Sequence, residues 1–398
     1  MKILQVTPIF VPAKSNGLKV MSHHIAQALA KRGHEVTVYT TDVDAGCSRL
    51  RNIQGLEKID GMKVRYFKNV SNLLAYKYRG YLPVKMFRTV SKEISSFDII
   101  HLHDFRHVLN VIVHHYAQKH AIPYVLDAHG STPRIGRRVK RGLQRLFDLA
   151  FGYRLLRDAS RVIALTEVMV NEYKEVGVEQ GKIILLAPLP SDPEEFSQLP
   201  PSGNFRHKFG IKEKHILMFF GRIHWVKGLD FLVESFHELA QHRSDVILAI
   251  VGPDDGYKST LEGLIERLHI SDKVLFTGFL GGEEKLSALV DANVVFQISR
   301  YEAGPGASFE AILCNTPIIV SKHTGAGEIV RKTDTGYLVE YGNKDELVDT
   351  VQKILDNPAE AMTKTQKAKD YIKTSLSTAK GIKNYENLYQ EVVESCKK

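Results

Sequence analysis

The stretch that decides the fold is "ANVVFQISRYEAGPGASFEA", residues 292–311. Its apolar beginning predicts a buried strand, its small residues predict a loop, and "ASFEA" has the composition of a helix start. Strand, loop and helix in this order form the repeating unit of parallel α/β sheets. Glu302 and Glu310 stand eight positions apart around the loop, so the segment also predicts a place where two carboxylates meet a ligand.

The same unit recurs along the whole chain. Apolar runs that precede helical patterns include "KILQVTPI", "HEVTVYTTD", "FDIIHLHD", "PYVLDAHG" and "SRVIALTE", and later "HILMFFGR", "DVILAIVGP", "KVLFTGFL" and "TPIIVSK". Strands that alternate with helices predict an α/β fold with a doubly wound parallel sheet. Because the pattern stops once and restarts, we expect two Rossmann-like domains that face each other across a cleft.

The interruption lies at residues 187–205, where five prolines stand among Asp, Ser and Gly. This composition is typical of a linker. We therefore expect an N-terminal domain over 1–190, a hinge over 191–205 and a C-terminal domain over 206–376. A last helix over 377–398 could cross back to the first domain.

The composition favours a globular enzyme or binding protein. Of the 398 residues, 43% are hydrophobic and 25% are charged, and no apolar run reaches the roughly 18 residues of a membrane-spanning helix. The opening "MKILQVTPIF" has no small-residue cleavage site and predicts a buried strand instead of a signal peptide. Three widely spaced cysteines predict neither a disulfide framework nor a zinc site. We expect a cytoplasmic location.

The charge is unevenly divided. Residues 1–200 hold 29 Lys and Arg against 18 Asp and Glu, whereas residues 201–398 hold 25 against 27. A basic excess confined to one half indicates an anionic partner for that half, either a membrane surface or a nucleic acid. A solvated basic surface with no partner is the plainer alternative.

Two segments carry most of this excess. "RIGRRVKRGLQRLFDLAF" (134–151) combines clustered arginines with apolar residues at helical spacing, and "LLAYKYRGYLPVKMFR" (73–88) mixes tyrosines with basic residues. Such segments favour peripheral attachment to the cytoplasmic face of an anionic membrane. A helix that packs on its sheet and keeps a wet basic face would look the same. The candidate membrane or acceptor residues are Tyr76, Lys77, Arg79, Arg137, Arg138 and Arg141.

A second candidate loop is "FFGRIHWVKGLD" (219–230), in which Arg222 and Lys227 follow a strand between glycines. Arginine offers a planar fork to phosphate oxygens and lysine offers a compact charge, so the pair suits a diphosphate. Two such cations would also stabilise a diphosphate as it departs. Taken alone, an Arg and a Lys on a loop more often face solvent.

The loop around Glu302 complements these cations. A helix start presents unpaired amides and the positive end of its dipole, which suits phosphate. Gly304 and Gly306 would let the backbone approach a ligand closely. Because a carboxylate accepts hydrogen bonds in pairs, Glu302 and Glu310 suit sugar hydroxyls and a ribose diol.

In combination these motifs resemble one family. The ordered set "GRIHWVKG", "VGP", "TGF", "YEAGPGASFEA" and "SKHTGAGEIV" resembles the C-terminal domain of the family-4 retaining glycosyltransferases, the glycosyl transferases group 1, which have the GT-B fold. The N-terminal half is similar through "HHIAQALAKRGHEVTVYTTD", "FDIIHLHD", "PYVLDAHG" and "ASRVIALTE". The resemblance covers nearly the whole chain.

The resemblance implies a role for each matching residue. It implies catalytic roles for His129, Glu302, Arg222 and Lys227, with the two cations gripping the donor diphosphate and His129 beside the transferred sugar. The further donor-binding residues would be Gly17, Gly252, Phe279, Leu280, Gly304, Pro305, Gly306, Ala307 and Glu310.

The function expected from the resemblance is retaining transfer of a hexose-type sugar from a nucleotide diphosphate sugar to an acceptor hydroxyl. The donor would be a UDP- or GDP-sugar and the acceptor a lipid-linked or cell-envelope glycan, with no metal and no other cofactor. "DVD" (42–44) looks like a metal-binding Asp pair, but it follows an early strand far from the two cations, and we discount it. The alternatives are a GT-B sugar-nucleotide epimerase or phosphorylase and, in another class, a basic nucleic-acid-binding protein.

Overall fold

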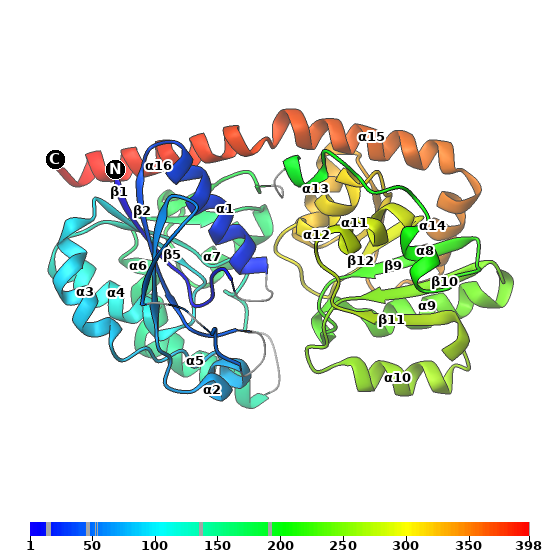
Figure 1. Cartoon of the computed structure of the whole chain (residues 1–398), viewed down its shortest axis with the longest axis horizontal. Helices are drawn as coiled ribbons and strands as arrows, with labels where there is room; N and C mark the ends of the chain where they lie inside the picture. The colour runs from blue at the N-terminus through cyan, green and yellow to red at the C-terminus, as the bar shows by residue number, and fades with distance from the viewer. Residues whose placement is uncertain are drawn as a thin grey trace. The chain divides into compact units, whose positions relative to one another are not determined.

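The computed structural model describes residues 1–12, 17–44, 48–51, 53, 55–134, 138–189 and 193–397. The chain forms two compact units, one of Met1–Ala187 with Ala379–Lys398 and one of Pro188–Thr378. Each unit is a sheet with helices between its strands (Figure 1). The expected α/β class with two Rossmann-like domains is confirmed.

The first unit is built on an eight-stranded sheet in the order β3-β4-β2-β1-β5-β6-β7-β8. All neighbouring strands are parallel except β3 and β4. The strands are β1 Lys2–Val6, β2 Glu35–Thr41, β3 Leu56–Ile59, β4 Met62–Phe67, β5 Ile99–His103, β6 Tyr124–Asp127, β7 Arg161–Ala164 and β8 Ile183–Leu185. The central strands β5 and β6 are buried along their whole length, as expected for a sheet that is covered on both faces.

The connections of the first unit are mostly helical. Its helices are α1 Gly17–Lys31, α2 Asn72–Tyr78, α3 Met86–Glu93, α4 Val108–Lys119, α5 Arg138–Phe147, α6 Tyr153–Arg157 and α7 Glu167–Glu175. A π-helical turn, Asp148–Gly152, joins α5 to α6, so the predicted basic helix runs on with one wide turn.

The last helix, α16 (Thr378–Lys397), returns the chain to the first unit. Its Tyr385 and Tyr389 are fully buried against the sheet, where the Tyr389 hydroxyl lies 2.7 Å from Nδ1 of His101. Glu386 accepts a hydrogen bond from Nε of Arg32 at 2.7 Å. The helix is therefore part of the core of this unit.

The second unit has a six-stranded, fully parallel sheet in the order β11-β10-β9-β12-β13-β14. Its strands are β9 His215–Phe220, β10 Val246–Val251, β11 Val274–Gly278, β12 Val294–Gln297, β13 Ile318–Ser321 and β14 Tyr337–Val339. Its helices are α8 Asn204–Lys208, α9 Leu229–His242, α10 Lys258–Arg267, α11 Gly282–Asp291, α12 Gly306–Leu313, α13 Gly325–Thr333, α14 Lys344–Asp356 and α15 Pro358–Ser375.

Alternate residues of β9 enter two separate cores. Ile216 and Met218 pack with α11, α12, α13 and α15 on one face, and Leu217 and Phe219 pack with α9, α10 and α14 on the other. Successive side chains of a strand point to opposite faces, so a strand that is apolar throughout requires helices on both sides. This is the physical reason why "HILMFF" forms a central strand.

Candidate active site

Except for Gly17, which lies in the first unit, the residues predicted to bind the donor gather at or near one edge of the second sheet. Strands β11, β10, β9 and β12 are neighbours and run parallel, so their carboxyl ends lie at the same edge. The candidates follow these strands: Arg222 and Lys227 after β9, Gly252 after β10, Phe279 and Leu280 after β11, and Glu302 with Gly304, Pro305, Gly306 and Ala307 after β12. This edge is where open α/β sheets bind their ligands.

Lys227 and Glu302 form an ion pair at the centre of this edge. Lys227 ends a short 3-10 turn after β9, and its Nζ donates to Oε2 of Glu302. Their side chains are only 19% and 16% exposed, so water screens the pair less than it screens a surface pair. The structure thus brings together one predicted cation and one predicted carboxylate.

The Glu302 segment is fixed by its neighbours as well. Ser299 Oγ lies 3.4 Å from Oε2 of Glu302, and the Glu302 carbonyl accepts a hydrogen bond from Gly325 N at 2.8 Å. The second bond ties the loop to the first turn of α13. Glu302 therefore has a defined position before any ligand binds.

The start of α12 lies between the two predicted glutamates. Pro305 occupies the N-cap position, where it makes no side-chain capping bond. The Gln297 side chain donates from Nε2 to the Gly304 carbonyl at 3.1 Å and accepts from the Ser308 hydroxyl. These two bonds fix the loop between β12 and α12. The first-turn amides of α12 are the groups that could bind a phosphate.

Gly252 has a structural role that explains its residue type. Its φ is +145°, and a Cβ built there would lie 1.8 Å from the Gly221 carbonyl oxygen. Two loops of the sheet edge, those after β9 and β10, therefore touch through their backbones. Any larger residue at position 252 would push the Arg222 loop away from the edge.

Arg222 pairs with a carboxylate that the sequence did not single out. Its Nη1 donates to Oδ2 of Asp255, and the arginine side chain is 47% exposed. The predicted pair of cations is thus held by two different acids, Arg222 by Asp255 and Lys227 by Glu302.

Glu310 projects from α12 toward Lys285 of α11. The Nζ of Lys285 lies 3.3 Å from Oε2 of Glu310 and donates to Oε1 of Glu195 at 2.7 Å. Burial by itself lowers the pKa of Lys285, and the carboxylates of Glu310 and Glu195 outweigh it, so the pKa lies above its ordinary value. Lys285 therefore stays charged and holds Glu310.

Phe279 and Leu280, the predicted contacts to a base, differ in exposure. Phe279 is 61% exposed, whereas Leu280 is buried in the core of the second unit. An exposed aromatic ring directly after β11 offers an apolar surface to a flat ligand.

His129 follows β6 in the first unit and belongs to a buried polar chain. Its Nε2 lies 2.9 Å from Nδ1 of His103, and its Nδ1 lies 3.5 Å from Oδ2 of Asp127. The backbone N–H of His129 donates to Oδ1 of Asp127 at 2.8 Å. Its backbone is left-handed, with φ of +47°, so the loop turns sharply where the histidine stands.

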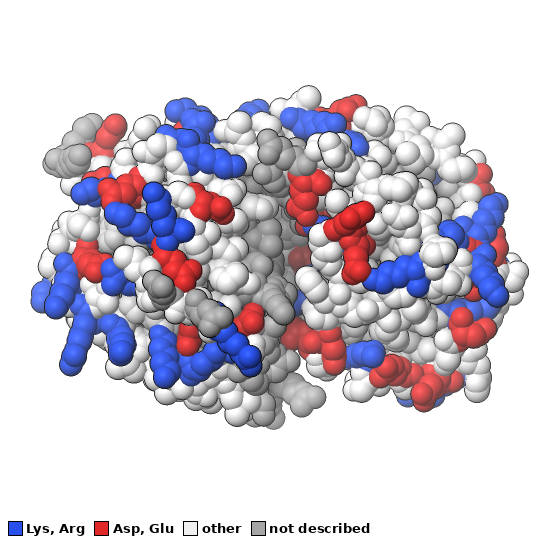
Figure 2. All heavy atoms as spheres, viewed as in Figure 1, with Lys and Arg blue, Asp and Glu red and all other residues white. Residues whose placement is uncertain are grey.

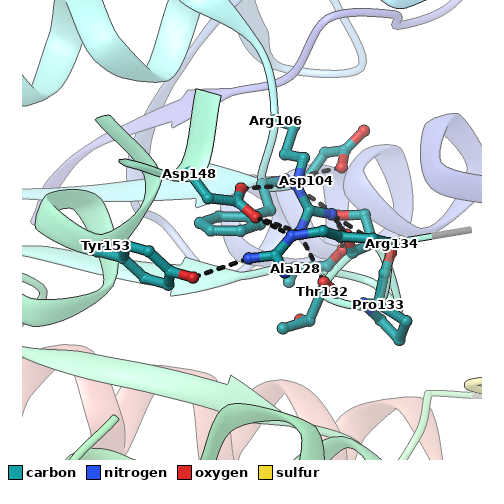
Figure 3. A network of polar contacts seen from close by, with 10 residues as sticks. Asp104, Arg106, Ala128, Thr132, Pro133, Arg134, Asp148 and Tyr153 are labelled. Atoms are coloured by element: carbon teal, nitrogen blue, oxygen red, sulfur yellow. Dashed lines mark hydrogen bonds and ion pairs between the residues drawn. The ribbon is translucent and has the colours of Figure 1, made fainter. Parts of the chain in front are cut away.

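The loop that follows His129 is clamped by buried charges (Figure 3). The guanidinium of Arg106 donates to both carboxylate oxygens of Asp148, at 2.7 and 3.0 Å, and to the Thr132 carbonyl at 2.7 Å. Arg134 donates from Nε to Oδ2 of Asp148 at 2.8 Å and from Nη2 to the Tyr153 hydroxyl at 2.7 Å. The clamp joins the loop after β6 to the π-helical turn that follows α5.

The remaining candidates lie on helices of the first unit or outside the described residues. Gly17 begins α1, and Tyr76 and Lys77 lie in α2, where their side chains are not described. Arg138 begins α5, also without a described side chain, Arg141 is exposed on α5, and Arg137 lies outside the described residues. Arg79 ends α2, and its Nη1 lies 3.3 Å from Oδ2 of buried Asp104.

The discounted "DVD" segment is part of a local network. Asp42 accepts a hydrogen bond from Asn69 N at 2.8 Å and pairs with Arg49. Within the described ranges no group of His, Cys, Asp and Glu side chains is placed to hold a metal ion. In the same part of the chain, no helix combines the length and the apolar character that crossing a bilayer requires.

Sequence reasoning missed Lys285, Asp255 and His103 as partners of the candidate residues. Lys285 lies in "GEEKLSALV", which resembles an ordinary amphipathic helix, so no local signal marks it. His103 ends a strand next to the strand that precedes His129, and this adjacency could have drawn attention to it.

Comparisons with known proteins agree with this architecture. A model described as "Glycosyl transferases group 1" matches residues 202–374, and one described as "Glycosyl transferase 4-like domain" matches residues 16–188. The N-acetyl-alpha-D-glucosaminyl L-malate synthase of Bacillus anthracis is 24% identical, with 96% of this chain and 95% of the relative covered.

Two solved structures show the same fold. Sucrose-phosphate synthase from Thermosynechococcus elongatus has a TM-score of 0.78 at 20% identity, with 99% of both chains covered. The Anabaena protein HepE in complex with UDP-glucose has a TM-score of 0.76 at 18% identity, with 98% of this chain and 100% of that chain covered.

Proposed function

Because this chain belongs to the group 1 glycosyl transferases and has the GT-B fold, we propose that it is a retaining hexosyltransferase. It transfers the sugar of a UDP- or GDP-sugar to an acceptor hydroxyl and needs no metal ion. The Lys227–Glu302 ion pair at the carboxyl edge of the second sheet carries the proposal. UDP-glucose in the similar HepE structure supports a nucleotide-sugar donor.

The charges at this edge suit the two ends of such a donor. Lys227, Arg222 and the α12 amides would bind the diphosphate and stabilise the charge that develops on it as the bond to the sugar breaks. Glu302, next to Lys227, would accept hydrogen bonds from sugar hydroxyls. Glu310, one turn into α12, would accept those of the ribose.

The contacts of Glu302 favour a binding role over a covalent one. Lys227 and Ser299 already engage its Oε2, which lowers its tendency to attack an anomeric carbon. In our proposal the departing phosphate takes the proton of the acceptor hydroxyl, and the acceptor attacks the face that the phosphate leaves. His129, in the first unit, contacts the transferred sugar.

The test is a panel of UDP- and GDP-sugars incubated with and without acceptors in the presence of EDTA. We expect turnover only with an acceptor, and a product with the anomeric configuration of the donor, as NMR of the anomeric proton shows. An inverted product, or activity abolished by EDTA and restored by Mg²⁺, would refute the mechanism. Epimerised or phosphorolysed sugar without acceptor would establish the alternative enzyme class.

We also propose that the acceptor is lipid-linked or part of a cell-envelope glycan, and that the first unit binds an anionic membrane peripherally at the cytoplasmic face. On α5 and the turn after it, Leu143, Leu146, Leu149 and Phe151 are 45–64% exposed beside exposed Arg141 and Arg145. Apolar side chains flanked by cations suit the headgroup region of such a bilayer. Lys and Arg gather over the elements α2, α3 and α5 on the face drawn in Figure 2.

Flotation with vesicles of phosphatidylglycerol tests the membrane part. We expect the protein to float at low salt. Leu146→Ser should weaken flotation, while Met362→Ser, which replaces an exposed apolar side chain of the second unit, should not. No flotation of the wild type would refute membrane binding. Transfer to a small acid such as malate, which the name of the Bacillus relative contains, would refute the lipid-linked acceptor.

A further inference from the structure

A chain of buried polar side chains runs along one face of the first sheet and ends at His129. Gln5 lies on β1, His101 and His103 on β5, and Asp127 on β6; Gln5 is in register with His101, and Asp127 with His103. Residues in register on parallel neighbours share a face, so all four side chains project to the same side. His103 links this group to His129.

We infer that Gln5 and His103 are positioning residues that fix the ring proton of His129 on Nε2. The inference rests on the proposed function only in taking His129 as a contact of the transferred sugar. The geometry itself involves no ligand.

The proton assignment follows from the partners of His103. Its Nε2 lies 3.1 Å from Oε1 of Gln5, an atom that can only accept, so Nε2 of His103 carries a proton and donates. Its other nitrogen, Nδ1, faces Nε2 of His129 at 2.9 Å. If His103 is neutral, its Nδ1 must accept, and His129 must donate from Nε2.

The surroundings keep His103 neutral. The side chain is completely buried, and the ring of His101 packs against it with centroids 3.9 Å apart. Burial lowers the pKa of His103 well below its ordinary value, and the neighbouring histidines lower it further. A second ring proton on His103 would therefore be strongly unfavourable near neutral pH.

Asp127 completes the arrangement on the other side of the His129 ring. Its Oδ2 lies 3.5 Å from Nδ1 of His129 and, among the described residues, has no hydrogen-bond partner. Burial raises the pKa of Asp127, while His129 opposes the rise. Asp127 thus lies on the Nδ1 side of the His129 ring, away from the proton on Nε2.

The ring orientation of His129 is fixed by the same contacts. The His103 and His129 rings are nearly parallel, with an interplanar angle of 13° and centroids 5.2 Å apart. The His129 side chain is 12% exposed, so a ligand can reach only a small edge of it. A ring held in one tautomer and one plane presents the same edge to every ligand molecule.

Other titratable groups lie beside these polar side chains. Four of them have partners, whereas the Tyr385 hydroxyl has no hydrogen-bond partner among the described residues. Asp104 is paired with Arg79, Nε2 of His107 contacts the His103 carbonyl at 2.8 Å, and the Tyr389 hydroxyl contacts His101. Tyr173 donates to the Ile163 carbonyl at 3.0 Å, and Tyr385 is fully buried with its ring centroid 5.9 Å from that of His101. These groups lie next to the buried polar side chains, but the contact between His103 and His129 involves only the two histidine rings.

The direct test is NMR of ring nitrogens in protein labelled with ¹⁵N-histidine. The His129 signals are assigned by their loss in His129→Gln. We expect the wild type to carry its proton on Nε2, and Gln5→Met to move it partly or wholly to Nδ1, because His103 then loses the acceptor that fixes its own proton. A wild-type His129 protonated on Nδ1, or a tautomer unchanged in Gln5→Met, would overturn the inference.

A kinetic cycle tests the functional consequence. We expect Gln5→Met to lower kcat of transfer severalfold in the wild type but to have no further effect in a His129→Gln background, since Gln5 acts only through His129. A purely structural effect would persist in both backgrounds and would refute the positioning role. His114→Gln, which removes a histidine paired with Asp158 at 3.0 Å elsewhere in the unit, is the matched control and should leave kcat unchanged. If the protein transferred no sugar, the NMR result would still decide the tautomer.

Discussion

Lys227 and Glu302 are 75 residues apart in the chain, yet Nζ of the lysine donates to the carboxylate of the glutamate at the carboxyl edge of the second sheet. The pairing of β9 with β12 brings them together, because each residue lies just beyond the end of one of these neighbouring strands. The partly buried pair places a cation beside a carboxylate. In the proposed function these two groups would bind the diphosphate and the sugar hydroxyls of one donor.

Removing the cation should affect the chemical step. We expect Lys227→Met to lower kcat about a hundredfold or more, the usual loss when one group that stabilises developing charge is removed. Lys208→Met is the control, because Lys208 pairs with Glu284 on an exposed surface of the same unit. Steady-state kinetics with the preferred donor provide the measurement. A loss of kcat no larger than that of the control would show that Lys227 does not stabilise the departing diphosphate.

Glu310 should act on binding of the donor. We expect Glu310→Gln to raise the donor KM about tenfold or more with a smaller change in kcat, because a charge-assisted hydrogen bond to the ribose would be weakened. The variant should also discriminate less between a donor and its 2′-deoxyribose analogue. Equal discrimination by wild type and variant would show that Glu310 does not contact the ribose.

The sequence predicts those residues of the site whose positions follow from the order of strand, loop and helix along the chain. Glu302 and Lys227 each follow a strand-like run, and the order of strand, loop and helix places them at a sheet edge without knowledge of the fold. Lys285 could not be found in this way. Its contact with Glu195 joins segments 90 residues apart, and only the packing of α11 brings the two side chains together.

Asp148 shows the same limit in the first unit. In the sequence it is one acid within a basic amphipathic helix, and the helical spacing does not reveal its burial. The structure buries it between Arg106 and Arg134 and leaves Leu146 exposed. The π-helical turn and the ion pairs of Asp148 determine which side chains of this segment are buried. The local sequence pattern predicts neither of them.

The buried clamp predicts a large effect on stability. We expect Asp148→Asn to destabilise the first unit by about 3–5 kcal/mol, because it leaves the Arg106 guanidinium buried without its counter-charge. Thermal unfolding followed by circular dichroism measures the change. Glu35→Gln, which removes an exposed ion pair with Lys63 in the same unit, should change the midpoint very little. Similar midpoints for the two variants would contradict the clamp.

The docking of α16 should depend on pH through Glu386. Hydrogen bonds from Arg32 and then His34 lower the pKa of this carboxyl from 4.5 to about 2. A carboxyl with a lowered folded-state pKa stabilises the fold above its unfolded pKa, and this stabilisation fades as the pH falls from about 4.5 toward 2. Glu386→Gln should therefore unfold at a lower temperature than the wild type at pH 7, and the difference should shrink as the pH falls through that range.

Glu391→Gln, which removes a more exposed carboxylate of α16 paired with Arg161, is the control and should show a small difference at every pH. Thermal melts from pH 7 to 3 give the comparison, and a difference between Glu386→Gln and wild type that stays constant or grows toward low pH would show that this carboxylate does not hold the helix.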